Sequence, residues 1–283
     1  MPTALITGGT SGIGQGLTVD LARHGYAVHF VGRDRDRGER LQASLRAEGH
    51  HATFHAVDLA VLRDVQRFAD TFATAVPSLD RLVCSAGVIL PREQRTSEGH
   101  EVTLAVLCFG VQLLCTALAP ALARAHQARI VTISGRPALV LRPRLDLTNL
   151  DSERRYRGLR TAAAGVHAKT VLTQCLAERL APQGILVNAV HPGPVRSDLG
   201  RSLPWPLRRP VQWVTGWWPE VSASAVHVCR SPLGGVTGQL FVGTEPRPLA
   251  FDAGYREALW QRVDELVSAT LAGDAGPDPS EVG

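Results

Sequence analysis

The sequence predicts a single α/β domain in which a parallel sheet of about seven strands carries helices on both faces. Short, nearly continuous apolar runs alternate with longer helical patterns along the 283 residues, which is typical of strands buried on both faces. The expected strands are Ala4–Thr7, Ala27–Val31, Thr53–Val57, Arg81–Ser85, Arg129–Ser134, Ile185–Val190 and Gln239–Val242. The helices expected between them are Gly12–His24, Arg35–Glu48, Val61–Ala75, Ser97–Ala125, Arg154–Ala181 and Val221–Arg230.

The composition is that of an ordinary globular protein. Hydrophobic residues make up 45% and charged residues 20% of the chain, which excludes disordered and fibrous classes. The net charge is +4 and the basic residues are scattered, so nucleic acid is not expected as a partner. Of the 30 basic residues, Lys169 is the only lysine and the other 29 are arginines. This bias is typical of a bacterial genome rich in G and C.

The cysteines and the apolar runs predict the compartment. The five cysteines form no C-x-x-C pair, so we expect buried, reduced thiols and no metal site. No apolar run reaches the ~18 residues that a membrane-spanning helix needs. Met1-Pro2 leads directly into a strand rather than into a signal peptide. The sequence therefore predicts a cytoplasmic protein.

A glycine-rich turn joins the first strand to the first helix. Thr7 to Gly14 read TGGTSGIG. Glycines allow the backbone to approach a pyrophosphate closely, and the helix N-terminus offers free N–H groups to it. This strand–turn–helix context is typical of a Rossmann-type, doubly wound, dinucleotide-binding sheet. The alternative is a glycine-rich turn that binds no ligand.

Further residues at strand ends fit a bound nucleotide. Arg33 ends the second strand, where a guanidinium can pair with a 2′-phosphate, so NADP(H) is favoured over NAD(H). The alternative is a solvent-exposed arginine in an arginine-rich stretch. Asp58 closes the third strand, where a carboxylate can accept a hydrogen bond from an adenine amino group. Small residues at 84–87 close the fourth strand and allow close approach to a ribose.

Together these motifs resemble the short-chain dehydrogenase/reductase family, and within it the retinol-dehydrogenase-type members, over about residues 3–197. Also similar are TSEGHEVT at 96–103, Arg155-Tyr156 with Leu159-Arg160, and VNAVHPG at 187–193. The resemblance implies that the cofactor contacts are Gly8, Thr10, Ser11, Gly12, Ile13, Gly14, Arg33, Asp58, Leu59, Ser85, Ala86, Gly87, Pro192, Gly193, Val195 and Ser197.

The residues that carry the family's chemistry are expected to be replaced. Family dehydrogenases use a Tyr-x-x-x-Lys pair, in which the ammonium lowers the pKa of the phenol for proton transfer. A serine after the fifth strand and an asparagine in the preceding helix assist them. The residue four positions before Lys169 is Gly165, so this chain has no such pair. The flanking motifs put Ala162, Val166, Gly135 and Leu107 in the tyrosine, lysine, serine and asparagine positions, which implies an apolar and roomier centre.

Three ionisable side chains near these positions are candidates for a substitute acid: Tyr156, His167 and Lys169. For His167 and Lys169 the alternative is a helix-surface or subunit-contact role. Ser134 is expected to point to the other face of the sheet, because strand side chains alternate. His191 is expected to support a loop.

Residues 199–219 contain four prolines and the tryptophans Trp205, Trp213, Trp217 and Trp218. The resemblance places this segment at the substrate lid, so large aromatic walls for a bulky apolar substrate are expected. The tryptophans could instead only pack the lid onto the domain. A membrane-binding role is disfavoured, because no basic amphipathic pattern flanks them. The domain is expected to span residues 1–271, followed by a flexible tail at 272–283.

Three functions remain open from the sequence. The first is a redesigned enzyme of bacterial secondary metabolism that cyclises, isomerises or eliminates, or that transfers hydride to an electrophile such as an iminium. The second is an NADPH-dependent carbonyl/alcohol oxidoreductase with a substitute acid. The third is a non-catalytic, nucleotide-binding scaffold. Family members often pair subunits through the helices after the fourth and fifth strands, so a homo-oligomer is also open.

Overall fold

The computed structural model describes residues 1–141, 145–151, 156–195 and 219–273. Its sheet has eight strands in the order β3-β2-β1-β4-β5-β6-β7-β8. The first seven are parallel and β8 pairs antiparallel with β7. The prediction of a Rossmann-type, doubly wound sheet is confirmed. The strands are β1 Thr3–Thr7, β2 Ala27–Gly32, β3 Ala52–Ala56, β4 Arg81–Cys84, β5 Arg129–Ile133, β6 Leu186–His191, β7 Gln239–Val242 and β8 Glu245–Pro248.

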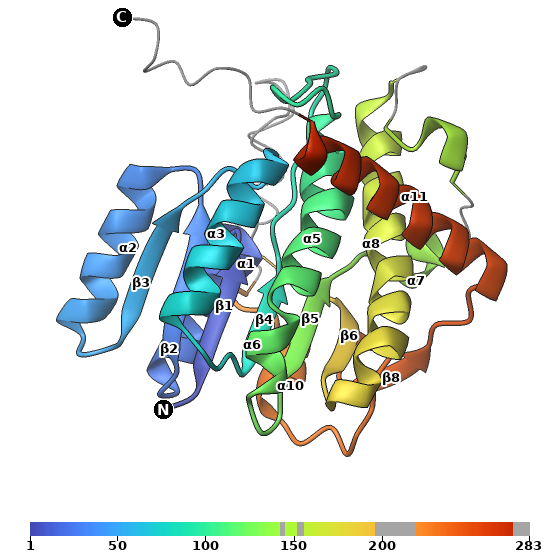
Figure 1. The fold of residues 1–283 in the computed structure, drawn as a ribbon. Coiled ribbons are helices and arrows are strands. Elements are labelled where there is room, and N and C mark those ends of the chain that lie inside the picture. Colours follow the sequence, from blue (N-terminus) through green and yellow to red (C-terminus); the bar gives the residue numbers. More distant parts are fainter. Residues whose placement is uncertain (142–144, 152–155, 196–218, 274–283) are drawn as a thin grey trace, which may run out of the picture.

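Helices cover both faces of this sheet (Figure 1). On one face lie α1 Gly12–Arg23, α2 Arg35–Ala47 and α10 Ala223–Arg230, which share a core cluster with β1, β2 and β5. On the other lie α3 Leu62–Ala75, α5 Gly110–Ala117, α8 Gly158–Leu180 and α11 Ala253–Ala272. A separate small cluster joins α7 Pro137–Val140 to β6 and β7. All five cysteines are buried and free, as predicted.

The helix predicted over 97–125 is wrong in its bounds and in its continuity. Helix α4 covers only Val102–Leu104 and runs into a π-helical turn at Ala105–Phe109, which α5 continues. Helix α6, Ala119–Ala123, follows with a proline in its first turn. Residues 97–101 form a turn instead of a helix, because Gly99 adopts a φ of +88° and the Glu101 side chain caps α4. A π-helical turn is rare and often marks a functional region.

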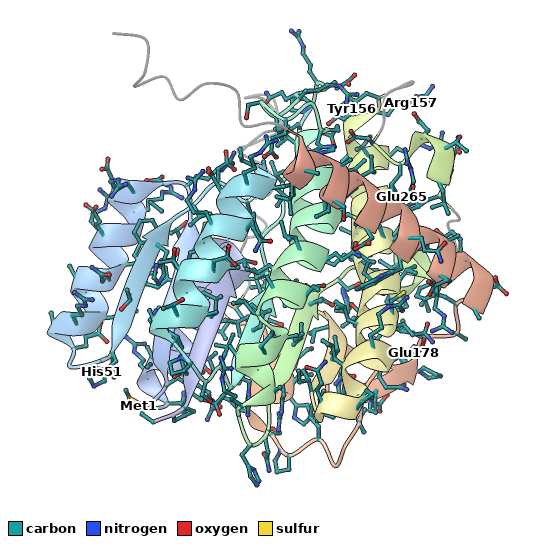
Figure 2. The ribbon with its side chains drawn as sticks, viewed as in Figure 1. Met1, His51, Tyr156, Arg157, Glu178 and Glu265 are labelled. Carbon is teal, nitrogen blue, oxygen red and sulfur yellow. The ribbon has the colours of Figure 1, made fainter. Side chains whose placement is uncertain are left out.

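The C-terminal helix α11 was not predicted. Its buried residues Leu259, Val263 and Val267 recur every four residues, so the helical pattern was present in the sequence. The helix crosses α3, α5 and α8 (Figure 1). Ion pairs between α8 and α11 hold it there: Arg179 with Glu257 at 2.6 Å, and Arg256 with Glu178, which Figure 2 labels.

Further differences concern the ends of elements. Helix α8 begins at Gly158, four residues later than predicted, and β8 was not predicted. Short 3-10 turns cover Leu147–Asn149 and Ala181–Gln183. The predicted tail at 272–283 lies almost wholly outside the described residues. Within the described part of the chain, no helix is both long and apolar enough to cross a membrane, and no cluster of three metal-binding side chains occurs.

Two histidines pack against each other on the neighbouring strands β2 and β3. His29 Nδ1 lies 3.0 Å from His55 Nε2, and their rings stack at 5.3 Å. Phe72 packs edge-on against His29, and Phe68 against His55. Burial lowers the pKa of both imidazoles, that of His55 to about 4. The pair is therefore neutral in the native protein at pH 7.

We expect this histidine pair to make the protein acid-sensitive. A folded-state pKa below the unfolded value gives stability that is present above about pH 6.5 and is lost as the pH falls toward about 4. His55→Phe should reduce the fall in Tm between pH 7 and pH 4.5 by about 3 °C, the effect of ~1 kcal/mol in a domain of this size. Circular dichroism melts measure this, with exposed His126 changed to Phe as the control. An equal acid-induced fall in both variants would contradict the expectation.

Candidate functional site

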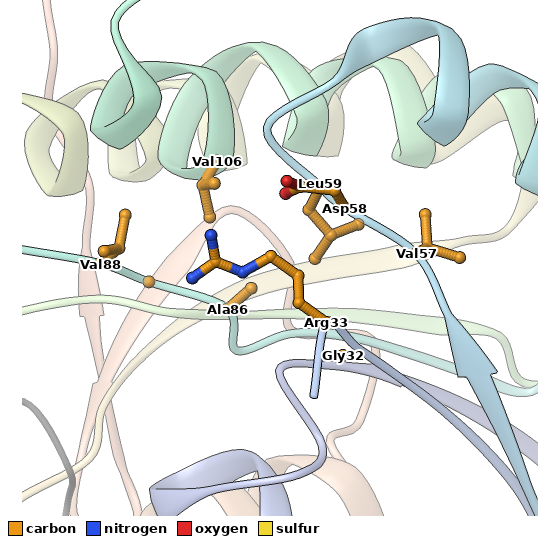
Figure 3. Close-up of a pocket in the computed structure, with 9 residues that line it drawn as sticks. Gly32, Arg33, Val57, Asp58, Leu59, Ala86, Val88 and Val106 are labelled. Atoms are coloured by element: carbon orange, nitrogen blue, oxygen red, sulfur yellow. The ribbon is translucent and has the colours of Figure 1, made fainter. Parts of the chain in front are cut away.

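A hollow opens at the carboxyl edge of the sheet, where the strand order reverses between β1 and β4 (Figure 3). This is the place where doubly wound sheets bind their ligands. The hollow is open to solvent, and the space in and directly above it amounts to about 370 Å³. It is lined by Gly32, Arg33, Val57, Asp58, Leu59, Ala86, Gly87, Val88 and Val106. Five of these were predicted as cofactor contacts from the sequence.

Among the described residues, Arg33 is the one cation that lines the hollow. Its side chain extends across the hollow between Ala86 and Val106, and Asp58 and Leu59 lie beside it (Figure 3). The guanidinium is exposed and makes no ion pair with another described residue. Asp58 is fixed, because its Oδ1 accepts a hydrogen bond from the Ala60 amide at 3.0 Å. The hollow therefore offers one cation and one oriented carboxylate to a ligand.

The glycine-rich turn lies at the same edge, between β1 and α1. Gly8 and Gly12 have φ values of +68° and +51°. A Cβ on Gly14 would lie 2.3 Å from the Gly8 carbonyl oxygen, and one on Gly8 would lie 2.9 Å from Cα of Ala86. Only glycine fits such close backbone contacts. The Ser11 side chain does not cap α1, so the first-turn amides are open to an anion.

The four positions predicted to replace the catalytic residues carry no ionisable side chain, and one of them, Leu107, reaches the edge of this hollow. A Cβ on Gly135, directly after the strand-end residue Ser134, would lie 3.3 Å from Val166 Cγ1. The Leu107 side chain packs against Gly165 and reaches Gly87 at the edge of the hollow. Ala162 and Leu107 are both buried. The expectation of a roomier centre is wrong next to Gly135, because Val140 Cγ1 would lie 3.1 Å from a Cβ there.

Tyr156 lies just before α8, beside Arg157 (Figure 2). Its hydroxyl donates a hydrogen bond to the Leu90 carbonyl at 2.9 Å. Burial raises the pKa of the phenol, which is the opposite of what a proton-transferring tyrosine needs. The geometry therefore gives Tyr156 a loop-binding contact.

His167 is buried, so the alternative of a surface or subunit-contact residue is wrong. Its Nδ1–H donates to the Val140 carbonyl at 2.7 Å, and its Nε2 lies 2.9 Å from the Tyr255 hydroxyl. That hydroxyl also accepts from the Leu145 amide at 3.1 Å, so it donates to Nε2. Burial lowers the pKa of His167 and favours this neutral form. Both ring nitrogens are thus used to join α7, α8 and α11.

Lys169 is also buried, with only 2% of its surface exposed, so a surface role is wrong for it as well. Burial lowers the pKa of its ammonium group to about 8, and the electrostatic neighbour is Cys84. Its side chain makes no hydrogen bond or ion pair with another described residue. The recurrence of Gly165, Leu172 and Leu176 around it on the buried face of α8 was the sequence signal for this burial.

The remaining predicted residues lie at the ends of β5 and β6. Ser134 Oγ is 2.6 Å from Thr170 Oγ1 of α8. The expectation that Ser134 points to the other face of the sheet is wrong, because Gly135 also faces α8, at Val166. His191 Nδ1 is buried without a partner among the described residues; burial and then Arg136 lower the pKa of its ring. Gly193 has a φ of +72°. Pro192 and Val195 belong to the same loop, whereas Ser197, Trp205, Trp213, Trp217 and Trp218 lie outside the described residues.

Two residues that shape the surroundings of Gly135 and His167 were not predicted from the sequence. Val140 fills the space beside Gly135, and Tyr255 of α11 orients His167. Neither carries a motif, because both act through contacts between segments far apart in the chain.

Comparison with known proteins agrees with this geometry. Residues 2–145 match the family model for short chain dehydrogenase. The chain is 34% identical to human dehydrogenase/reductase SDR family member 13, over 98% of this chain and 76% of that protein. It is 31% identical to mouse retinol dehydrogenase 14, over 94% of this chain and 85% of that protein.

A solved structure extends the likeness to a nucleotide complex. A short chain dehydrogenase from Burkholderia cenocepacia in complex with NADP is 26% identical, with a TM-score of 0.59, over 85% of this chain and 95% of that one. The chain therefore belongs to the short-chain dehydrogenase/reductase family and is similar to its retinol dehydrogenases.

Proposed function

We propose that this chain is an NADP(H)-binding enzyme that works without the tyrosine–lysine pair of its family, on a bulky apolar small molecule. One observation carries the proposal. A glycine turn with no room for a Cβ, and a hollow whose arginine pairs with no described carboxylate, adjoin the apolar side chains of Leu107 and Val166. The glycine turn and the hollow suit a dinucleotide. The side chains of Leu107 and Val166 have no group that could move a proton.

The described residues around the hollow fit NADP(H). When bound, this cofactor supplies a hydride donor or acceptor. Arg33 would pair with the 2′-phosphate and the first-turn amides of α1 with the pyrophosphate. Asp58, held by the Ala60 amide, would accept from the adenine amino group. The absence of a competing carboxylate on Arg33 among the described residues supports the phosphate assignment over NAD(H).

The apolar centre supports catalysis by orientation and exclusion of water. A dry, shaped surface can hold reactive groups of one substrate together for cyclisation, isomerisation or elimination. Hydride transfer to an electrophile such as an iminium also needs no acid from the protein. The tryptophans of the predicted lid would add large aromatic walls for such a substrate. We propose that this substrate belongs to bacterial secondary metabolism.

A second candidate function is an NADPH-dependent carbonyl oxidoreductase with a substitute acid. One observation favours Lys169 for that role over the other two candidates. Tyr156 and His167 are engaged in contacts with the protein, whereas the Lys169 side chain has no hydrogen bond to a described residue. A non-catalytic scaffold would bind the nucleotide with no turnover.

Nucleotide preference tests the cofactor assignment. Arg33→Ala should weaken NADP⁺ binding at least tenfold and leave NAD⁺ binding nearly unchanged, because a charge-assisted hydrogen bond contributes ~1.5–3 kcal/mol. Isothermal titration calorimetry with both nucleotides measures this. Exposed Arg35, paired with Glu39, is the matched control as Arg35→Ala. Equal losses for both nucleotides would contradict the assignment, and no binding of either by the wild type would overturn the proposal.

Turnover separates the candidate functions. The wild type should show no NADP⁺-dependent oxidation of simple primary alcohols, since positioned acid–base groups contribute about 10²–10⁴-fold to such reactions. Absorbance of NADPH at steady state measures this, with an active family dehydrogenase as the positive control. Robust oxidation that Lys169→Met abolishes would support the oxidoreductase instead. Binding of NADP⁺ without turnover of any apolar pathway intermediate would favour the scaffold.

A further inference from the structure

Arginines without a polar partner gather at the carboxyl edge of the sheet. Of the 21 arginines that the structure describes, seven have a side chain with no hydrogen bond, ion pair or ring contact to another described residue. Arg33 is the one that lines the hollow. Two others belong to α2 and β8. The remaining four flank the positions predicted to replace the catalytic residues. The full set is Arg33, Arg40, Arg92, Arg136, Arg157, Arg160 and Arg247.

Arg136 is the one of these four that directly adjoins a replaced catalytic position. It follows Gly135, so their Cα atoms are about 3.8 Å apart. A Cβ on Gly135 would lie 3.3 Å from Cγ1 of Val166, which is partly exposed. The backbone of Arg136 is fixed, because its carbonyl accepts hydrogen bonds from the Leu139 and Val140 amides at 2.8 and 3.2 Å. Its side chain is exposed, so a free cation stands next to the predicted serine position.

The end of β6 lies beside Arg136. The Ser134 amide donates to the Val190 carbonyl at 2.8 Å, so β5 and β6 are still paired two residues before Arg136. His191 ends β6, and Arg136 contributes, after burial, to lowering the pKa of its ring. The loop that follows begins with the predicted cofactor contact Pro192. Arg136 is therefore adjacent both to the predicted serine position and to this loop.

The other three arginines flank the start of α8. The Tyr156 hydroxyl donates to the Leu90 carbonyl at 2.9 Å, which holds the chain after β4 beside the beginning of this helix. Arg92 follows Leu90 by two residues, Arg157 directly precedes α8, and Arg160 lies in its first turn. All three are exposed, and Figure 2 labels Tyr156 and Arg157 at this end of the molecule. The predicted tyrosine position follows two residues after Arg160.

The carboxylates of the same segments are already engaged. Glu93 pairs with Arg95 at 2.6 Å. The others cap the helices α3 and α4 or a 3-10 turn, or bind the ring of a neighbouring histidine. The described parts of residues 88–160 outside α5, α6 and β5 contain five: Glu93, Glu98, Glu101, Asp146 and Asp151. No described carboxylate of these segments is left to neutralise the four arginines.

The excess positive charge extends to the sequence outside the described segments. Residues 142–144, 152–155 and 196–218 contain eight arginines and only two acidic residues. Charges of one sign around a site attract molecules of the opposite sign. A guanidinium binds a carboxylate or phosphate through two parallel hydrogen bonds. Since the proposed cofactor would engage Arg33, the other four arginines remain for a second anion.

We propose that the substrate of this site is an apolar molecule that carries a carboxylate or a phosphate, and that Arg136 binds this anionic group. The inference names the substrate class of the function proposed above and rests on it. The apolar body would lie against the partly exposed Val166, while the anion stays at the exposed rim, where its charge is not buried. Arg136 would thus select the substrate and fix which end of it faces the cofactor.

Binding of matched probes tests this inference. At pH 7.5, 2-naphthoate and 2-naphthyl phosphate are anions and 2-naphthol is neutral, but all three share one apolar ring system. Isothermal titration calorimetry with the NADP⁺-loaded protein should show at least tenfold tighter binding of one of the anions than of naphthol. Comparison of the two anions identifies the group. Arg136→Gln should reduce this preference about tenfold, the effect of one charge-assisted hydrogen bond, and leave naphthol binding unchanged.

Two further variants control for net charge and for geometry. Arg247 is also exposed and has no described partner, but it lies on β8, so Arg247→Gln should keep the full preference. Arg136→Lys should keep part of it, because an ammonium keeps the charge without the two parallel hydrogen bonds. All variants should melt with the wild-type Tm by circular dichroism, since the substituted side chains are exposed.

The inference is overturned if naphthol binds as tightly as both anions, if none of the three probes binds, or if Arg247→Gln acts as strongly as Arg136→Gln. An equal loss of NADP⁺ binding in Arg136→Gln would also contradict it, because the arginine would then serve the cofactor. NADP⁺ is titrated separately. Nucleotide binding without a preference for anions would reject the substrate class and keep the proposed function. A preference for anions in a protein that does not bind NADP⁺ would do the reverse.

Discussion

The close backbone packing where β1 passes into α1 is the constraint on which the rest of the structure depends. The Gly8 carbonyl oxygen occupies the space that a Cβ of Gly14 would need, and Gly8 itself lies against Ala86. The Ala86 amide donates to Thr7 Oγ1 at 3.1 Å, which joins the end of β1 to the turn after β4. Since β1 and β4 are neighbours at the centre of the sheet, the same contacts that close the core also form one wall of the hollow.

A second set of contacts, made by helix α11, fixes the residues around Gly135. Helix α11 contributes Tyr255, which orients His167, and His167 in turn binds the Val140 carbonyl. The Val140 side chain then fills the space beside Gly135. At its far end α11 accepts hydrogen bonds from Arg63 of α3, through the Thr270 and Gly273 carbonyls. One helix thus contacts both α3 and α8, and the orientation of His167 depends on Tyr255, 88 positions away.

The seven parallel strands and the glycine turn could be predicted from the sequence because short apolar runs and glycine spacing are local signals. Arg33, Asp58 and Leu59, predicted as cofactor contacts, line the hollow for the same reason: they lie within three residues of the ends of β2 and β3. The prediction of one helix over 97–125 was wrong. Its π-helical turn at Ala105–Phe109 is buried throughout, and helix propensity does not report such packing. For His167 and Lys169 the alternative of a surface or subunit-contact role was wrong, because the buried face of α8 includes both. Polar side chains in a helix look solvent-exposed until the partners on other elements are known.

The short antiparallel strand β8 has a consequence for how the sheet ends. It caps the β7 side, and two of its four residues, Pro246 and Pro248, have no N–H to donate. A further strand laid along this edge could not form a continuous ladder, because alternate bonds would be missing. These two prolines therefore disfavour edge-to-edge pairing of β8 with a strand of another copy of the chain.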